Sequence, residues 1–583
     1  MSDYVYSING PVITVRNTKS FAMREMVYVG EKHLLGEVIR INDDRTTIQV
    51  YESTTGLKPG EEVVGTGSLL NAVLGPGLLK NIYDGIERPL EKIQEIEGAF
   101  ISEGRTVPSI DMDKKWDVTM KISTGDVVTE GQIFATCPET STIEHRSMIP
   151  NGVHGKVVSA VPSGSYTVND VLAVIEDEKT GDKTEVTLKQ RWPVRIPRPI
   201  KAREPLSMPL ITGQRVLDTM FPIAKGGSAA LPGGFGAGKT MLQHSIAKFC
   251  DADIIIYVGC GERGNEMTQV LEEFAELKDP KTGNSLLDRT VLIANTSNMP
   301  VAAREASIYT GVTIAEYYRD MGYHVALMAD STSRWAEALR EISGRLEEMP
   351  AEEGFPAYLP SRIAQFYERA GYVDTLSRQK GSVTLIGAVS PQGGDFSEPV
   401  TQNTRRFVRC FWALDKSLAY ARHYAAVNWN DSSSEYVEDL SRWYSENVNP
   451  SFMQLRAEMQ EILHQEDSLM EVVKLIGSDV LPEDQKLTLE IARVVRVGYL
   501  QQNAFHPDDM SVPLEKQFKM MKVISYLNRA CRAKIEKKIP VSLMLKTGIF
   551  ETVIKMKFDV PNNKIEMLDD YPSMIDEALD SIL

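Results

Sequence analysis

Short runs of alternating apolar and polar residues dominate the first seventy positions of the chain. Examples of these runs are Val12–Val15, Met26–Val29 and Thr47–Tyr51, and Gly- and Asp-rich turns separate them. Strands at such regular spacing predict a small β-barrel over residues 1–70. Because no basic stripe with interleaved aromatic residues accompanies the strands, we expect a structural or assembly role for this barrel.

The pattern changes after residue 70 and predicts a linker followed by a second β-rich module. Residues 71–111 are interpreted as a linker and the start of the next α/β domain, with a short helix where Leu78–Ile82 leads into Asp84–Leu90. Residues 112–190 return to strand-like runs and are interpreted as a separate inserted module. These runs are Trp116–Met120, Gly131–Ala135, Gly155–Val158 and Val171–Ile175. The proline-rich strip Trp192–Pro199 favours extended backbone between domains.

From residue 191 to residue 434, continuous apolar runs alternate with helical stretches. The apolar runs are Ile254–Val258, Thr290–Ala294, Val325–Ala329 and Ser382–Ile386. Such runs predict strands that are buried on both faces, and therefore a parallel, doubly wound sheet whose ligands bind at the carboxyl ends of the strands. Residues 435–583 are charged and helical, for example in Met453–Ile462, Asp467–Leu475 and Lys486–Gln502. We interpret this last segment as a helical interaction or lever domain.

Composition and charge narrow the class of protein. The 583 residues are 42% hydrophobic and 25% charged, which is typical of a multidomain globular protein. A formal net charge of -16 argues against a protein that mainly coats nucleic acid. No uninterrupted apolar run reaches the roughly 18 residues of a membrane span, and the first residues lack the apolar core of a signal peptide. We therefore expect a cytosolic protein that can still dock on a membrane complex.

The five cysteines indicate neither a disulfide framework nor a zinc site. They are scattered without C-x-x-C spacing, at Cys137, Cys250, Cys260, Cys410 and Cys531. We interpret them as small buried side chains in a reducing compartment.

One octapeptide matches the G-x-x-x-x-G-K-[ST] pattern of a phosphate-binding loop. Its residues are Gly233, Gly234, Phe235, Gly236, Ala237, Gly238, Lys239 and Thr240. Glycines allow the tight turn that points several backbone N–H groups at one anion. Lys239 then supplies a positive charge near the β- and γ-phosphates, and Thr240 supplies a hydroxyl to Mg²⁺. The helix predicted at Met241–Phe249 begins at this loop, and a helix N-terminus favours negative charge.

Two further stretches place carboxylates at the ends of predicted strands. Val325–Asp330 is an apolar strand that ends in an acid, as in the Walker-B arrangement, where the acid holds Mg²⁺ or its water shell. Gly259–Glu266 follows the strand Ile254–Val258, and Glu262 within it is placed to orient or deprotonate an attacking water. A solvated turn with charged side chains is the alternative for the second stretch.

Together with Leu327–Ala336, the two motifs at Gly233–Thr240 and Gly259–Glu266 resemble the catalytic A subunit of the V-type and archaeal-type (V/A) rotary ATPases. The resemblance covers nearly the whole chain, including the inserted module that F-type β subunits lack. It implies a multidomain α/β protein with an N-terminal β-barrel, an inserted β-rich module, a RecA-like P-loop nucleotide-binding domain with a parallel sheet, and a C-terminal helical domain. The ligands implied are ATP or ADP and Mg²⁺.

The resemblance also implies roles for single residues. Lys239 is similar to the phosphate-binding lysine of the family, and Thr240 and Asp330 are similar to its magnesium-binding hydroxyl and Walker-B acid. Glu262 resembles the glutamate that polarises the attacking water, and Arg263 the arginine that contacts the γ-phosphate.

A pocket for adenine is implied by a further match. Tyr424 stands where the family usually has a phenylalanine against the adenine, and the opposite wall is matched by Gln502, Asn503, Ala504 and Phe505. An ordinary core aromatic is the alternative for Tyr424. Gly234 and Ala425 stand where relatives often have proline, and Ala237 stands where many eukaryotic vacuolar relatives have cysteine, which favours a prokaryotic source.

The partners implied are those of a rotary motor. A non-catalytic B subunit would form an A₃B₃ hexamer with this chain and supply an arginine finger in trans. The acidic turn Gly477–Asp484 resembles the loop that faces the central rotor. A peripheral stalk would complete the complex, no nucleic acid is expected, and membrane contact would run only through the membrane sector, on the cytoplasmic face. The choice between H⁺ and Na⁺, and between synthesis and hydrolysis, is not encoded in this chain.

Two other functions are compatible with the same P-loop core. One is a hexameric translocase, acting on RNA or in secretion. The other is a non-catalytic ring protein, against which the intact Lys239, Thr240, Glu262 and Asp330 argue.

Overall fold

The computed structural model describes residues 3–16, 20–98 and 101–582, and the chain divides into two compact units. Unit 1 consists of Met1–Pro205, Lys225–Ala230 and Ala252–Val408. Unit 2 consists of Leu206–Ala224, Leu231–Asp251 and Arg409–Leu583. The backbone therefore passes from one unit to the other several times. No helix among the described residues has the length and apolarity needed to cross a membrane.

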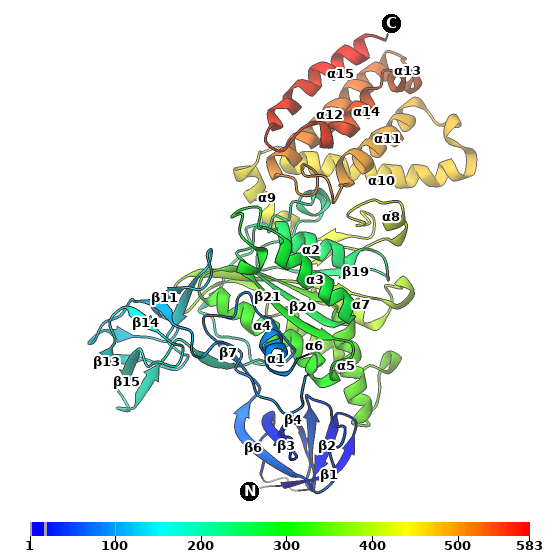
Figure 1. Ribbon diagram of the computed structural model, residues 1–583. Coiled ribbons are helices and arrows are strands. Elements are labelled where there is room, and N and C mark those ends of the chain that lie inside the picture. Colours follow the sequence, from blue (N-terminus) through cyan, green and yellow to red (C-terminus); the bar gives the residue numbers. More distant parts are fainter. Residues whose placement is uncertain (1–2, 17–19, 99–100, 583) are drawn as a thin grey trace. The chain divides into compact units, whose positions relative to one another are not determined.

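Unit 1 begins with the predicted β-barrel, drawn in blue in Figure 1. Its strands close in the order β1-β2-β5-β4-β3-β6, with antiparallel pairing between neighbours. Alternate residues such as Ile13, Val27 and Val38 point inward and are fully buried, which is why the period-two pattern closes around one core. The bounds are β1 (Asp3–Asn9), β2 (Val12–Val15), β3 (Glu25–Val29), β4 (Leu34–Ile41), β5 (Thr46–Val50) and β6 (Glu62–Leu69).

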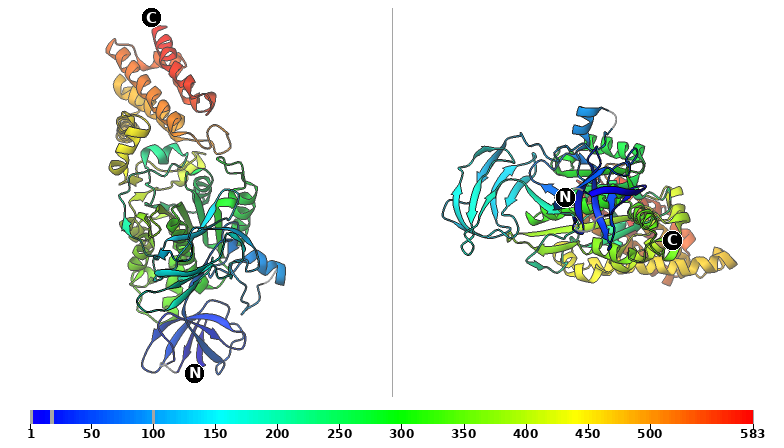
Figure 2. Two further views of the ribbon diagram at one scale, coloured as in Figure 1. Left: turned by 90° about the vertical axis from the view of Figure 1, so that its left-hand side faces the viewer. Right: turned by 90° about the horizontal axis from the view of Figure 1, so that it is seen from below.

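The inserted β-rich module is also confirmed. It contains two four-stranded sheets, in the orders β10-β13-β15-β16 and β12-β11-β9-β14, which are seen as the cyan strands in Figure 2. The bounds are β9 (Trp116–Met120), β10 (Val127–Val128), β11 (Ile133–Pro138), β12 (Glu144–Met148), β13 (Gly155–Ala160), β14 (Gly164–Tyr166), β15 (Ala173–Glu176) and β16 (Lys183–Val186). Next to the module, β17 (Gln190–Pro193) pairs with β7 (Asn71–Leu74).

The parallel sheet of unit 1 contains all four apolar runs that the sequence singles out. Its strands lie in the order β24-β22-β20-β21-β8, and every neighbouring pair is parallel. The bounds are β8 (Ile82–Tyr83), β20 (Ile254–Glu262), β21 (Thr290–Thr296), β22 (His324–Asp330) and β24 (Lys380–Val389). The short β23 (Gly371–Asp374) is antiparallel to β24 and also pairs with β18 (Ala202–Arg203).

Helix α4 (Val301–Asp320) is buried over almost its whole length against this sheet. Small side chains permit the close approach, because a Cβ atom on Gly311 would lie 2.6 Å from Cγ2 of Val258 in β20. The other helices of unit 1 are α1 (Leu90–Glu97), α3 (Gly264–Glu276), α5 (Thr332–Arg345), α6 (Leu359–Tyr367) and α7 (Pro399–Phe407).

The helix predicted between residues 78 and 90 is displaced. Leu78–Ile82 is not helical: it forms a turn that leads into β8, and the helix α1 starts only at Leu90. The reason is long-range pairing, since Ile82 and Tyr83 align with Leu292 and Ile293 of β21.

Unit 2 contains the helix that follows the phosphate-binding loop and the helical C-terminal segment, shown in yellow to red in Figure 1. Met453–Ile462 and Asp467–Leu475, both predicted to be helical, are parts of a single helix. Helix α11 ends at Arg493 and continues as a π-helical turn, Val494–Leu500. The helices are α2 (Lys239–Phe249), α8 (Lys416–Tyr420), α9 (Val437–Asn447), α10 (Phe452–Ile476), α11 (Glu483–Arg493), α12 (Leu514–Glu536), α13 (Val541–Lys546), α14 (Ile549–Asp559) and α15 (Tyr571–Asp580).

One arginine connects the barrel to the sheet domain within unit 1. Arg195 donates from Nε and Nη2 to the carboxylate of Glu37 in β4, at 3.1 and 3.0 Å. It also donates from Nη1 and Nη2 to Glu305 in α4, at 2.9 and 2.7 Å. Burial alone would raise the pKa of Glu305, but the Arg195 guanidinium outweighs burial and holds this pKa below its usual value.

Replacing Arg195 with Met should strongly destabilise the protein. The buried carboxylates of Glu37 and Glu305 would lose the guanidinium that pairs with both of them, at a cost of about 3–5 kcal/mol. The denaturant midpoint of the full-length variant measures this loss. The exposed Arg191 on β17 provides a matched control, and an Arg195→Met chain as stable as Arg191→Met would contradict the prediction.

Candidate functional site

The predicted phosphate-binding loop lies in unit 2, between β19 (Ser228–Pro232) and α2. Gly236 and Gly238 have φ angles of 79° and 88°, in the left-handed region that favours glycine. A Cβ atom on either would meet no described atom within 4 Å, so the space beside the loop is open. Lys239 begins α2, and its Nζ donates to the carbonyl oxygens of Gly233 and Gly234, at 2.7 and 3.1 Å.

This loop has the features of an anion cradle. The N-terminus of an 11-residue helix meets the loop, and its exposed N–H groups and dipole favour a negative charge there. Thr240 lies half-buried in the first turn of α2. The loop residues predicted from the motif are therefore brought together at one helix end, and they fit a phosphate group.

A cavity of about 820 Å³ adjoins the loop within unit 2 and is large enough for a small-molecule ligand. Tyr424 lines this cavity together with Gln502, Asn503, Ala504 and Phe505, so the two predicted walls face one space. The backbone N–H of Gln502 donates to the carbonyl oxygen of Tyr424 at 2.6 Å, which ties the walls together.

The hydroxyl of Tyr424 is buried and hydrogen-bonded to the side chain of Ser245. Burial raises its pKa to about 12, while the hydrogen bond with the Ser245 side chain acts in the opposite direction. Ser245 in turn accepts a hydrogen bond from Nε2 of Gln214, at 3.1 Å. The additional oxygen of tyrosine, compared with phenylalanine, is thus bonded to the protein and leaves the ring face available for stacking.

The side chain of Gln502 holds the backbone rather than facing the cavity as a recognition group. Its Oε1 accepts from the backbone N–H of Arg215 at 2.5 Å, and its Nε2 donates to the carbonyl oxygen of Asp509 at 2.7 Å. Arg215 itself is completely buried and pairs with Asp509 at 2.6 Å. The cavity wall is therefore built on a buried ion pair.

Sequence reasoning missed several residues that line this cavity. Arg422 neighbours Tyr424 in the chain, while Met241, Lys557 and Phe558 come from α2 and α14. Lys557 is held by the carbonyl oxygens of Val497 and Gln501. No motif marks Lys557 or Phe558, because they reach the cavity only through the packing of the C-terminal helices.

The predicted carboxylates lie in unit 1, at the ends of neighbouring parallel strands. Glu262 is the last residue of β20, and Asp330 is the last residue of β22. The register aligns Gly259 with Asp330, and Glu262 lies three residues beyond Gly259; the charge of Asp330 still raises the pKa of Glu262. Asp330 accepts a hydrogen bond from the hydroxyl of Tyr257 at 3.1 Å. The structure thus brings Glu262 and Asp330 together, as the strand positions predict.

The surroundings of Glu262 disfavour its ionised form. Burial is the largest cause that raises its pKa to about 8, and the charge of Asp330 and a hydrogen bond with Glu266 raise it further, against the lowering effect of Arg334. Glu266 and Arg334 were not singled out from the sequence as site residues. Arg263 is exposed and occupies the N-cap position of α3, where its side chain makes no hydrogen bond to the helix.

The crowded carboxylates fit a nearby cation such as Mg²⁺, which would reduce their repulsion. In the described part of the chain, no group of three or more His, Cys, Asp or Glu side chains could hold a metal. A Mg²⁺ ion here would therefore take most of its ligands from phosphate oxygens and water, as Mg²⁺ commonly does.

Family models match four segments of the chain. Residues 5–67 match the β-barrel domain of the ATP synthase alpha/beta family, and residues 107–195 match its barrel-sandwich domain. Residues 213–434 match the nucleotide-binding domain of the same family. Residues 441–544 match the C-terminal domain of V and A type ATP synthase.

Two curated relatives are similar over nearly their full length. The V-type ATP synthase alpha chain of Halothermothrix orenii is 59% identical, over 98% of this chain and 97% of that one. The corresponding A subunit of the A-type ATP synthase of Methanopyrus kandleri is 54% identical, over 99% of this chain and 98% of that one.

A solved structure shares the fold at low identity. The ATPase EscN of the enteropathogenic E. coli type III secretion system has a TM-score of 0.63 and 20% sequence identity, over 90% of this chain and 99% of that one. At this identity the likeness concerns the fold alone.

Replacing Glu262 with Gln should stabilise the chain in alkaline solution. Because the pKa of Glu262 is raised from 4.5 to about 8, the stability that its protonated form contributes is complete below about pH 4.5 and is lost as the pH rises through about 8. The gain in Tm of Glu262→Gln over wild type should therefore grow between about pH 5 and pH 9, and calorimetry of both chains measures it.

Glu272, exposed on α3, the helix that follows β20, is the matched control. Its change to Gln should give no such trend. A gain in Tm for Glu262→Gln that is equal at both ends of the pH range would show that the pKa of Glu262 is not raised in the folded chain.

Proposed function

The chain belongs to the family of V-type ATP synthase alpha chains and A-type ATP synthase A subunits, and from that premise we propose which of its residues perform the chemistry. As a member of this family it is the catalytic subunit of a rotary ATPase, which hydrolyses or synthesises ATP in coupling to ion translocation. The proposal concerns the roles of single side chains, the partners and the cellular location.

The phosphates of ATP or ADP bind at the loop Gly233–Thr240. The backbone N–H groups near Gly236 and Gly238 and the N-terminus of α2 surround the phosphate oxygens. Lys239 moves from its carbonyl partners to the β- and γ-phosphates, and Thr240 with Asp330 would hold Mg²⁺ directly or through water. When bound, Mg²⁺ neutralises the charge that develops on the phosphate oxygens.

Glu262 orients the attacking water and accepts its proton. The observation that carries this assignment is that Glu262 and Asp330 end neighbouring parallel strands, where burial and the charge of Asp330 raise the pKa of Glu262 to about 8, close to cellular pH. A general base works best when its pKa lies near the operating pH. Arg263, the next residue in the chain, contacts the γ-phosphate.

The base of the nucleotide stacks on Tyr424. The cavity beside the phosphate-binding loop supports this assignment, because it is lined on one side by Tyr424 and on the other by Asn503, Ala504 and Phe505. The Tyr424 ring provides the stacking face. Gln502 acts here as a positioning residue that holds this wall through Arg215 and Asp509.

The chain works within a multisubunit complex, as its family membership implies. We propose that its neighbour in an A₃B₃ hexamer is the B subunit, which supplies an arginine finger in trans, and that central rotor and peripheral stalk proteins are further partners. The corresponding location is the cytoplasmic face of a membrane, with contact only through the membrane sector. The secretion ATPase alternative has only the distant likeness to EscN in its favour.

The Glu262→Gln variant tests the proposed base in the assembled complex. Loss of the proton acceptor should lower the rate of ATP hydrolysis by about 10²- to 10⁴-fold while nucleotide binding persists. Steady-state hydrolysis and binding of a fluorescent ATP analogue measure the two effects. Glu272→Gln is the control, and wild-type hydrolysis by Glu262→Gln would refute the role.

The need for a second subunit can be tested with purified components. The isolated chain should bind ATP weakly and hydrolyse it poorly, because a transition-state arginine contributes about 10³- to 10⁵-fold in rate. Adding purified B subunit should restore turnover, measured by phosphate release. Full activity from the isolated chain would exclude an arginine supplied in trans.

A further inference from the structure

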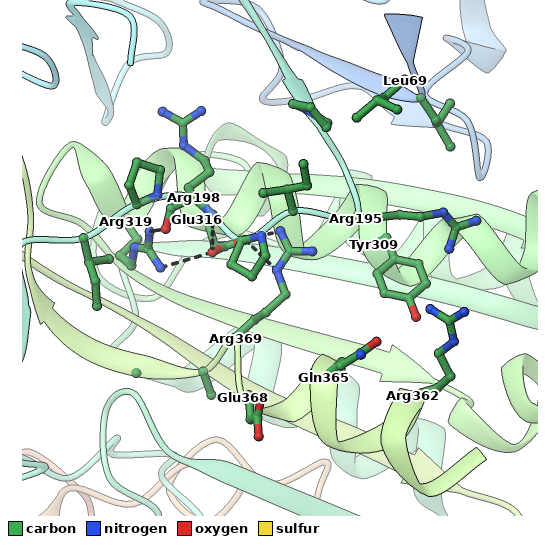
Figure 3. A pocket seen from close by; sticks show the side chains of 18 of the residues that line it. Leu69, Arg195, Arg198, Tyr309, Glu316, Arg319, Arg362, Gln365, Glu368 and Arg369 are labelled. Carbon is green, nitrogen blue, oxygen red and sulfur yellow. Dashed lines mark hydrogen bonds and ion pairs between the residues drawn. The ribbon is translucent and has the colours of Figure 1, made fainter. Parts of the chain in front are cut away.

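Unit 1 contains a second large cavity, of about 790 Å³, that no step of ATP turnover uses. Its lining comes from the barrel, from the proline-rich strip after β17, and from helices α4 and α6. Figure 3 shows the arginines Arg195, Arg198, Arg319, Arg362 and Arg369 around it. An arginine-rich cavity is unusual in a chain whose formal net charge is -16.

Two buried donors in this cavity lack a hydrogen-bond partner. The hydroxyl of Tyr309, a residue that is 3% exposed, bonds to no atom among the described residues. The same holds for Nη1 of Arg198, whose residue is 8% exposed. Burial raises the pKa of Tyr309, so its hydroxyl stays protonated and can donate. An unpartnered buried donor costs free energy unless a ligand satisfies it.

The guanidinium of Arg362 points toward the Tyr309 hydroxyl from α6, with Gln365 on the same helix beside them (Figure 3). Among the described residues no acceptor bonds to this guanidinium, which lies over the ring of Tyr358, with Cζ 5.6 Å from the ring centroid. The positive charge of half-buried Arg362 thus lies near the unpartnered hydroxyl donor of Tyr309.

The charges nearby do not cancel Arg362. Glu37 and Glu305 are both engaged by the fork of Arg195, and Arg24 also pairs with Glu37 at 3.6 Å. Three arginines therefore oppose two carboxylates at this end of the cavity. This leaves one positive charge in excess, that of Arg362. It lies next to the neutral hydroxyl of Tyr309, which has a proton to donate but no acceptor.

The lining also contains apolar side chains, among them Met23, Leu69, Leu70 and Pro197. A bare inorganic ion would leave this surface uncovered, and the cavity is far larger than one such ion requires. Arginine guanidinium groups match phosphate oxygens by paired hydrogen bonds. The lining therefore favours a ligand that combines an anionic group with an apolar body.

We propose that this cavity binds a small organic phosphate, with its phosphate on Tyr309 and Arg362 and its apolar body against the barrel residues. The site is separate from the phosphate-binding loop Gly233–Thr240 and does not depend on the roles proposed for it. A ligand held between the barrel and α4 would stabilise unit 1.

Phenyl phosphate is a suitable probe, and calorimetric titration of the full-length chain measures its binding. Arg362→Gln should weaken binding about tenfold or more, as for loss of a hydrogen bond to a charged group. Tyr309→Phe removes one oxygen without changing the shape, so it should weaken binding about threefold to tenfold while the Tm of the ligand-free chain stays the same or rises.

Three comparisons identify the site and the ligand class. Lys239→Ala, in the phosphate-binding loop, should retain the binding that Arg362→Gln loses. Arg442→Gln removes an equal charge from the exposed face of α9 and should bind as wild type does. Inorganic phosphate, which lacks the apolar body, and benzoate, which lacks the phosphate, should both bind more weakly than phenyl phosphate.

The proposal is overturned if Arg362→Gln and Tyr309→Phe bind phenyl phosphate as tightly as wild type, or if Lys239→Ala abolishes binding. Tighter binding of benzoate would reject phosphate as the ligand group. Absence of binding to the free chain, together with weaker assembly of Arg362→Gln with purified B subunit, would assign the cavity to a protein carboxylate instead.

Discussion

A parallel sheet that is buried on both faces accepts charge only where its strands end, and this constraint organises the chemistry of unit 1. The central strands β20 and β22 are buried along almost their whole length, so their charged side chains lie at the carboxyl ends. Glu262 and Asp330 end neighbouring parallel strands. Their mutual repulsion, added to burial, raises the pKa of Glu262 into the range where it can both hold and release a proton. The sheet thus produces a base that no isolated glutamate would provide.

The buried ion pair of unit 2 follows a different rule, because Arg215 and Asp509 both have further hydrogen-bond partners. Arg215 is fully buried, and its guanidinium pairs with Asp509 and donates to the carbonyl oxygens of Tyr499 and Gln501. A buried ion pair of this kind is tolerated only when further hydrogen bonds complete it. Gln502, the residue after Gln501, accepts a hydrogen bond from the backbone N–H of Arg215. The buried pair of Arg215 and Asp509 therefore also fixes the cavity wall opposite Tyr424. Rigid walls reduce the ordering cost of binding a planar base.

The sequence predicts those parts of the molecule whose signal is local. The alternation of Val27 and its neighbours predicts the barrel, the apolar run at Val325–Ala329 predicts a parallel strand, and the motif at Gly233–Thr240 predicts a phosphate cradle at a helix start. Features that depend on distant partners escape it. The local pattern of Leu78–Ile82 predicts a helix, yet Ile82 pairs with Leu292 of β21, more than two hundred positions away. Phe558 lines the cavity of unit 2 only because α14 packs there.

The arginine-rich cavity illustrates the same limit and also explains why such a site escapes motif reading. Arg195, Tyr309 and Arg362 come from a strip and two helices, and each alone resembles an ordinary structural residue. Arg195 satisfies two carboxylates, so it costs the fold little. The buried hydroxyl of Tyr309 lacks such a partner within the described residues, and a desolvated donor without an acceptor is a loss that close packing alone does not repay. The imbalance between satisfied and unsatisfied donors, rather than the number of arginines, is therefore the physical reason to assign a ligand to this cavity.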